Sequence, residues 1–291
     1  MAIPLNISFG GGLYCNTPFL QAFYAIRRLH LEWFDPQMKI TTIYDTFPSL
    51  IWNGGRPHSY KEIAREDKQK MINFFNNQNI GVNFTFSNLL LEEKHLTDKQ
   101  CNQVLTDFES PLNGCIVATE ILAQYIRQTY PQYRLILSVA KTTEPQFDES
   151  ALQKAVKEYD MVVFPDEYNK DFSFLRNFPA DKIELIVDEE CPKNCPYTQE
   201  HYQSISKYNL AVCEFPEQKH DFIKCKQPKE IKGNALTSEE MRCIYDQTGI
   251  SHFKFANRTY SVGHTIKTIC QYFVLQQYKT QFQSYIQKLI T

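Results

Sequence analysis

The chain has 291 residues, and its 31 lysine and arginine residues nearly balance 33 aspartate and glutamate residues, which leaves a formal net charge of -2. This balance gives no electrostatic case for a nucleic-acid or anionic-membrane partner. No segment approaches the roughly 18 consecutive apolar residues of a membrane span. The opening residues MAIPLNISFGG lack the features of a secretory signal, so we expect a cytoplasmic protein with reduced thiols.

Short apolar runs, rich in β-branched residues, alternate with segments of helical periodicity along the chain. Most of these runs are too short for helices and too continuous for half-exposed strands, which favours a parallel sheet covered by helices. The runs lie at residues 5–9, 39–44, 82–87, 114–118, 134–139, 161–164, 183–187 and 250–255.

The intervening segments carry signals for helix starts. Each of four begins with a pattern that fits a capping box, in which a side chain and the backbone satisfy one another's free hydrogen-bond donors. The patterns are Ser59-x-x-Glu62, Thr97-x-x-Gln100, Ser150-x-x-Gln153 and Thr237-x-x-Glu240. The segment from His264 to Ile290 is predicted to be one long amphipathic helix.

Eight strands that alternate with helices predict a (β/α)8 barrel of the TIM type. We expect one domain over residues 1–291, closed by the carboxyl-terminal amphipathic helix. An open, doubly wound parallel sheet is the alternative fold. It is less favoured because the glycines at Gly10–Gly12 lack the G-x-G-x-x-G pattern of a phosphate-binding turn.

Charged residues follow several of the predicted strands, where the active face of a barrel forms. These candidate catalytic residues are Asp45, Arg56, Asp166, Asp188, Lys254 and Arg258. The cations are suited to an anionic substrate, small or macromolecular. The three aspartates are candidate acid–base groups or groups that orient them.

Arg56 ends the loop segment TFPSLIWNGGR, which contains two adjacent glycines and Trp52. We interpret Trp52 as exposed and the loop as one that brings its backbone close to a ligand. The alternative is a rigid turn around a core tryptophan.

A second loop, in the stretch VDEECPKNCPYTQEHY, places Cys191 and Cys195 just after a predicted strand. Thiolates bind zinc and iron, but a site needs three or four ligands. Further candidates are His201, Cys213, Cys225 and Cys15, and unliganded or redox-active cysteines are the alternative. A hydrolase built from Cys195, His201 and Asp188 is disfavoured because nothing fixes a hydrogen bond between them.

The other cysteines are scattered through segments that read as helix or buried strand. We predict that Cys101, Cys115, Cys243 and Cys270 are small core residues.

The late segment GISHFKFANRTYS, together with the cysteine loop, resembles the collagenase-like peptidase family of unassigned catalytic type (family U, number 32). That family commonly shows a late strand of the form G-I-x-x-F-K-I-x-G-R. Here Gly249, Ile250, Phe253, Lys254, Phe255 and Arg258 match it, and Asn257 replaces the second glycine.

The resemblance implies a TIM barrel, and several members carry a four-iron four-sulfur cluster on cysteines. Some support oxygen-independent hydroxylation of RNA bases or quinone precursors. This chain lacks the family's usual group of four close cysteines. The ligands that the resemblance implies are Cys191, Cys195 and Cys225, with Cys213 or an open iron position as the fourth.

Three functions follow from these patterns. The first is an iron–sulfur barrel enzyme that modifies an anionic substrate. The second is a barrel with a closed structural zinc site made by Cys191, Cys195, Cys225 and one of His201 or Cys213. The third is a metal-free hydrolase or transferase acting on a peptide or sugar, and a binding module is the remaining alternative.

Overall fold

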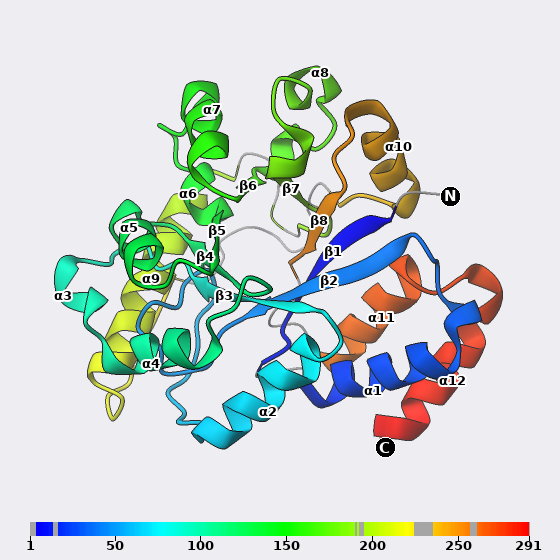
Figure 1. The fold of residues 1–291 in the computed structure, drawn as a ribbon, viewed down its shortest axis with the longest axis horizontal. Coiled ribbons are helices and arrows are strands. Elements are labelled where there is room, and N and C mark those ends of the chain that lie inside the picture. Colours follow the sequence, from blue (N-terminus) through cyan, green and yellow to red (C-terminus); the bar gives the residue numbers. More distant parts are fainter. Residues whose placement is uncertain are drawn as a thin grey trace.

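The computed structural model describes residues 4–13, 17–189, 191, 195–223, 235–256 and 261–290. Its centre is a closed barrel of eight parallel strands in chain order, with β8 paired to β1 (Figure 1). This confirms the predicted TIM-like barrel over the open sheet. The strands are β1 (Leu5–Gly10), β2 (Met38–Asp45), β3 (Gly81–Phe86), β4 (Gly114–Val117), β5 (Arg134–Leu137), β6 (Met161–Phe164), β7 (Ile183–Ile186) and β8 (His252–Phe255).

Helices surround this barrel (Figure 1). They are α1 (Thr17–Leu29), α2 (Arg65–Asn76), α3 (Glu93–Leu96), α4 (Lys99–Phe108), α5 (Glu120–Thr129), α6 (Val139–Thr142), α7 (Glu149–Glu158), α8 (Phe172–Leu175), α9 (Thr198–Glu214), α10 (Ser238–Thr248), α11 (Val262–Tyr272) and α12 (Lys279–Ile290). In the described part of the chain, no helix has the length and apolar character needed to cross a membrane.

Alternate residues of each strand face opposite sides of the sheet, so the barrel has two separate apolar cores. The larger lies between strands and helices and includes Ile7, Phe9 and Phe253. The smaller lies inside the barrel and is made by Tyr44, Ile116, Ile136, Val163, Ile186 and Ala256. The interior is therefore apolar on the side of β4, β5 and β6.

The opposite side of the interior is polar. Ser8 on β1 donates a hydrogen bond to Glu184 on β7, and its hydroxyl lies 2.7 Å from that of Thr42 on β2. Lys254 on β8 lies 3.3 Å from the same Glu184 carboxylate. We call Ser8, Thr42, Glu184 and Lys254 the polar seam.

Several predicted helix boundaries were wrong. Of the four proposed capping boxes, only the one at Thr237 and Glu240 begins a helix as predicted. The side chains of Asp98 and Asp148 cap α4 and α7 in place of Thr97 and Ser150. No helix begins at Ser59, because the hydroxyl of Ser49 bonds both the N–H and the carbonyl of Lys61 and holds this segment in a loop.

The predicted carboxyl-terminal helix is two helices, α11 and α12. Between them the chain returns to the start of the barrel: Val274 forms an isolated antiparallel bridge with Phe34, and the N–H of Leu275 donates to the carbonyl of Trp33. This pairing uses backbone groups that a continuous helix would need. After it, α12 packs beside α1 (Figure 1).

Candidate active site

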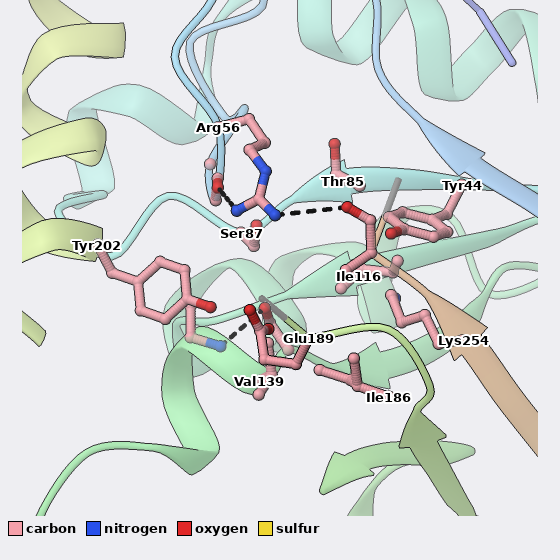
Figure 2. A pocket seen from close by; sticks show the side chains of 15 residues that line it. Tyr44, Arg56, Thr85, Ser87, Ile116, Val139, Ile186, Glu189, Tyr202 and Lys254 are labelled. Atoms are coloured by element: carbon pink, nitrogen blue, oxygen red, sulfur yellow. Dashed lines mark hydrogen bonds between the residues drawn. The ribbon is translucent and has the colours of Figure 1, made fainter. Parts of the chain in front are cut away.

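A pocket with a cavity volume of about 70 Å³, partly open to solvent, lies at the carboxyl ends of the strands. Its lining comes from the ends of five strands, from the segments that follow β2, β3, β5 and β7, and from α9. Arg56, Lys254, Glu189 and Tyr202 contribute its charged and phenolic groups, and Figure 2 shows that Arg56, Tyr202 and Glu189 point toward the same space. This is the face on which barrel enzymes carry their active sites.

The loop after β2 places Arg56 on the wall of the pocket. Gly54 lies directly against the end of β3: a Cβ there would be 2.2 Å from the carbonyl oxygen of Ser87. Gly55 has φ +73°, in the left-handed region that favours glycine. The Arg56 guanidinium donates to the carbonyls of Gly55 at 3.0 Å and Ala256 at 3.4 Å, which spans the gap from the loop to β8. The predicted close backbone approach is thus present, but its target is β3.

Two buried asparagines fasten this loop. Asn88, after β3, donates to the carbonyls of Ile51 and Asn53. Asn209, on α9, donates to the carbonyls of Asn53 and, at 2.9 Å, Arg56. Both have no exposed surface. The role of Asn209 was missed from the sequence, although its place on the apolar face of α9, between Ile205 and Val212, was an available signal.

The prediction that Trp52 is exposed was wrong. Its side chain has no exposed surface, and its indole N–H donates to the carbonyl of His95 at 2.8 Å. It packs edge-on against Phe86, with ring centroids 5.3 Å apart. Trp52 therefore anchors the base of the loop, as in the alternative interpretation.

Lys254 enters the pocket from the interior of the barrel. Its ammonium lies 3.3 Å from the Glu184 carboxylate and 4.0 Å from the centre of the Tyr44 ring. The ring face and the carboxylate both favour the cation. Tyr44 is fixed in turn because its hydroxyl donates to the carbonyl of Phe255. The structure thus places two of the predicted cations, Arg56 and Lys254, at one pocket.

Two further lining residues were not among the predicted catalytic residues. Glu189 lies just after β7, and its carboxylate accepts the N–H of Cys191 at 3.0 Å. Tyr202 projects from the first half of α9. Burial raises the pKa of its hydroxyl, the Glu189 carboxylate acts in the same direction, and Arg56 opposes it. Tyr202 is therefore a neutral hydrogen-bond donor near pH 7.

The predicted aspartates have different surroundings. Asp45 accepts the main-chain N–H of Leu13, and Asp188 accepts that of Ala256. These bonds join the segment after β1 to the end of β2, and the segment after β7 to the end of β8. An acid–base role for either aspartate stays a prediction. Asp166 begins a short 3-10 helix after β6 and does not line the pocket. Arg258 lies outside the described residues.

The cysteine loop adjoins the pocket. Cys191 and Cys195 are half-buried and come between Glu189 and the start of α9. Cys213 lies near the other end of α9, about 22 Å further along an axis that rises 1.5 Å per residue. Burial, with the charges of Asp98 and Glu214, raises its pKa to about 12. The proposal that Cys213 shares a metal with Cys191 and Cys195 does not fit this geometry.

Among the described residues, no group of three or more His, Cys, Asp and Glu side chains is arranged to hold a metal ion. The third implied ligand, Cys225, and Cys15 lie outside the described residues. Burial and the nearby Arg56 lower the pKa of His201. At this loop the described residues therefore supply two thiols, those of Cys191 and Cys195, which is fewer than a closed zinc site or a cluster requires.

The other cysteines follow the prediction with one exception. Cys101, Cys115 and Cys270 are buried, as expected for small core residues. Cys243 is exposed, because it lies on the face of α10 opposite to the buried Met241 and Ile244.

No family model matches the chain, and no curated protein matches it either. Among solved structures, it is similar to the U32 peptidase Mk0906, with a TM-score of 0.51 over 88% of this chain and 93% of that chain. The two sequences are 10% identical in this alignment, so the likeness shows the fold. The resemblance inferred from the late strand is confirmed at that level.

Proposed function

We propose that the pocket at the carboxyl ends of the strands is the active site of an enzyme that acts on an anionic substrate. The observation that carries the proposal is the entry of Arg56 and Lys254, from different parts of the chain, into one cavity on the active face of the barrel. A guanidinium binds a carboxylate or phosphate through two parallel hydrogen bonds. The Lys254 ammonium, which pairs with Glu184, forms part of the floor and is a further hydrogen-bond donor.

Glu189 and Tyr202 supply the proton-transfer groups in this proposal. The carboxylate of Glu189 is a proton acceptor, and the neutral Tyr202 hydroxyl is a donor aimed into the same space (Figure 2). Acid–base groups of this kind typically accelerate a reaction by about 10² to 10⁴. Ser87 and Thr85 line the pocket beside them and provide neutral hydroxyls for orientation.

The test is calorimetric titration of inorganic phosphate into the wild-type protein and three variants. Arg56→Gln is expected to weaken binding about 10- to 100-fold, because a hydrogen-bonded charge is lost. Glu189→Gln is expected to tighten it, because a like charge leaves the pocket. Arg28→Gln, on the exposed carboxyl end of α1, is the control and should bind as wild type does. Equal binding by Arg56→Gln and wild type would refute the proposed site.

A second candidate is metal-dependent modification of the same substrate, with an iron–sulfur cluster as the metal group. The hydrogen bond from Cys191 to Glu189 favours it, because it joins the cysteine loop to the pocket wall. In this candidate Cys191, Cys195 and Cys225 hold the metal. Protein purified without oxygen should then contain iron and sulfide and absorb broadly near about 400 nm. Zinc in a colourless protein would favour a structural zinc site. If the protein contained neither iron nor zinc, the metal-free enzyme would be the remaining candidate.

A further inference from the structure

A second cavity opens at the opposite end of the barrel, among the amino-terminal ends of the strands. Its cavity volume is about 310 Å³, and it is partly open to solvent. Its floor is polar, because Ser8, Thr42 and Glu184 of the polar seam line it. This is unusual, since barrel interiors are normally filled by branched apolar side chains. The amino-terminal mouth therefore has the size and polarity of a small-molecule site.

Two cations stand at this mouth. Arg134, the first residue of β5, lines the cavity, and its Nη2 donates to the carbonyl of Leu112 at 3.4 Å. Its Nε is buried and has no hydrogen-bond partner among the described residues. Lys39, near the start of β2, contributes an exposed ammonium. A buried N–H without a hydrogen-bond partner is destabilising, so an acceptor in the cavity would stabilise Arg134.

An acceptor without a partner also lines the cavity. Asn83 on β3 has 4% of its surface exposed, and its Oδ1 has no partner in the described part of the chain. Gly114 on β4 leaves room for this amide, since a Cβ there would lie 2.6 Å from Asn83 Oδ1. A ligand hydroxyl is the kind of donor that Asn83 Oδ1 lacks.

The charge balance at this mouth is positive. The Glu184 carboxylate already accepts a hydrogen bond from Ser8 and pairs with Lys254. His252 lines the same cavity. Burial lowers the pKa of its imidazole, and the charge of Arg134 also lowers it, whereas Glu184 and Asp181 raise it. His252 is therefore neutral near pH 7. The charges of Arg134 and Lys39 remain to attract an anion.

We propose that the amino-terminal mouth of the barrel is a second binding site, which takes a small hydroxy acid. Its carboxylate binds between Arg134 and Lys39, and its hydroxyl donates to Asn83 Oδ1. The site is separate from the pocket of Arg56 and does not depend on the function proposed for that pocket.

The experiment titrates malate and succinate, which differ by one hydroxyl, into wild type and variants by calorimetry. Malate is expected to bind wild type more tightly than succinate. Arg134→Gln should weaken malate about 10- to 100-fold, whereas Arg56→Gln and Arg28→Gln should leave it unchanged. Asn83→Leu should remove the preference for malate over succinate.

Lys39→Gln is the second variant if Arg134→Gln fails to fold, because Lys39 is exposed. It is expected to weaken the binding of both acids about 1.5-fold to fivefold, as for a rim charge. Three results overturn the proposal: no malate binding by wild type, binding lost in Arg56→Gln alone, or equal affinity for malate and succinate. Loss of malate binding in Arg56→Gln would place malate in the carboxyl-terminal pocket. The other two results leave phosphate binding at Arg56 unaffected, so the two proposals can be told apart.

Discussion

The two sides of the barrel interior differ in chemistry. On the side of β4, β5 and β6, Ile116, Ile136 and Val163 fill the space as in an ordinary core. On the other side, the polar seam places a charged pair where apolar side chains would fit. Lys254 lines the carboxyl-terminal pocket, and Glu184 lines the amino-terminal cavity. The apolar side also reaches these cavities, through Ile116 and Ile136, so what distinguishes the polar seam is an ion pair that runs from one cavity to the other.

The largest expected effect is on the ion pair of the seam. Glu184→Leu should lower the free energy of unfolding by about 3–5 kcal/mol, because it leaves the Lys254 charge buried without its partner. The double variant Glu184→Leu/Lys254→Met should recover most of this loss. Urea denaturation measures both. Val163→Ala, on the apolar side, should cost about 1.5–2.5 kcal/mol from its lost methyl groups. A double variant no more stable than Glu184→Leu would contradict this view of the seam.

A middle-sized effect is expected at the loop of Arg56. Gly54→Ala places a methyl group 2.2 Å from the backbone of Ser87, so the loop must shift. Stability should fall by about 1–3 kcal/mol, and phosphate affinity should fall with it as Arg56 is displaced. Malate affinity at the other mouth should stay at the wild-type value. If malate affinity changed as much as phosphate affinity, the two mouths would not be independent.

The smallest effect concerns pH. Because burial holds the pKa of folded His252 below its value in the unfolded chain, about 6.5, the unfolded state takes up the proton first as pH falls. The His252 contribution to stability is therefore full above pH 7 and is lost progressively below about 6.5. Unfolding curves from pH 7.5 to 5.5 should show a shallower decline for His252→Gln than for wild type. Parallel declines would show that another group dominates.

The sequence was sufficient to predict the strands, because apolar β-branched runs bounded by polar turns have few other interpretations. Helix starts were less well predicted, since Asp98 and Asp148 compete with neighbouring Thr97 and Ser150 for the same cap. Which of the two neighbouring residues becomes the N-cap depends on the residue at which the backbone first becomes helical.

The site was predicted in part. Arg56 and Lys254 could be predicted because strand ends can be located from sequence. The barrel then brings the two residues together at one pocket. Tyr202 and Asn209 were missed because they act from α9, far along the chain, and their roles depend on how that helix packs. For Asp45 and Asp188, the sequence could not distinguish a catalytic carboxylate from one that accepts a backbone N–H, because both occur at strand ends.

The fastening of the Arg56 loop has a kinetic consequence. Asn88, Asn209 and Gly54 hold a long segment without regular secondary structure against both β3 and α9. A loop that is ordered before ligand arrives loses little conformational entropy on binding. Association of an anion with this pocket should therefore follow a single bimolecular phase whose rate rises linearly with ligand concentration, without the plateau that a slow closing step would impose.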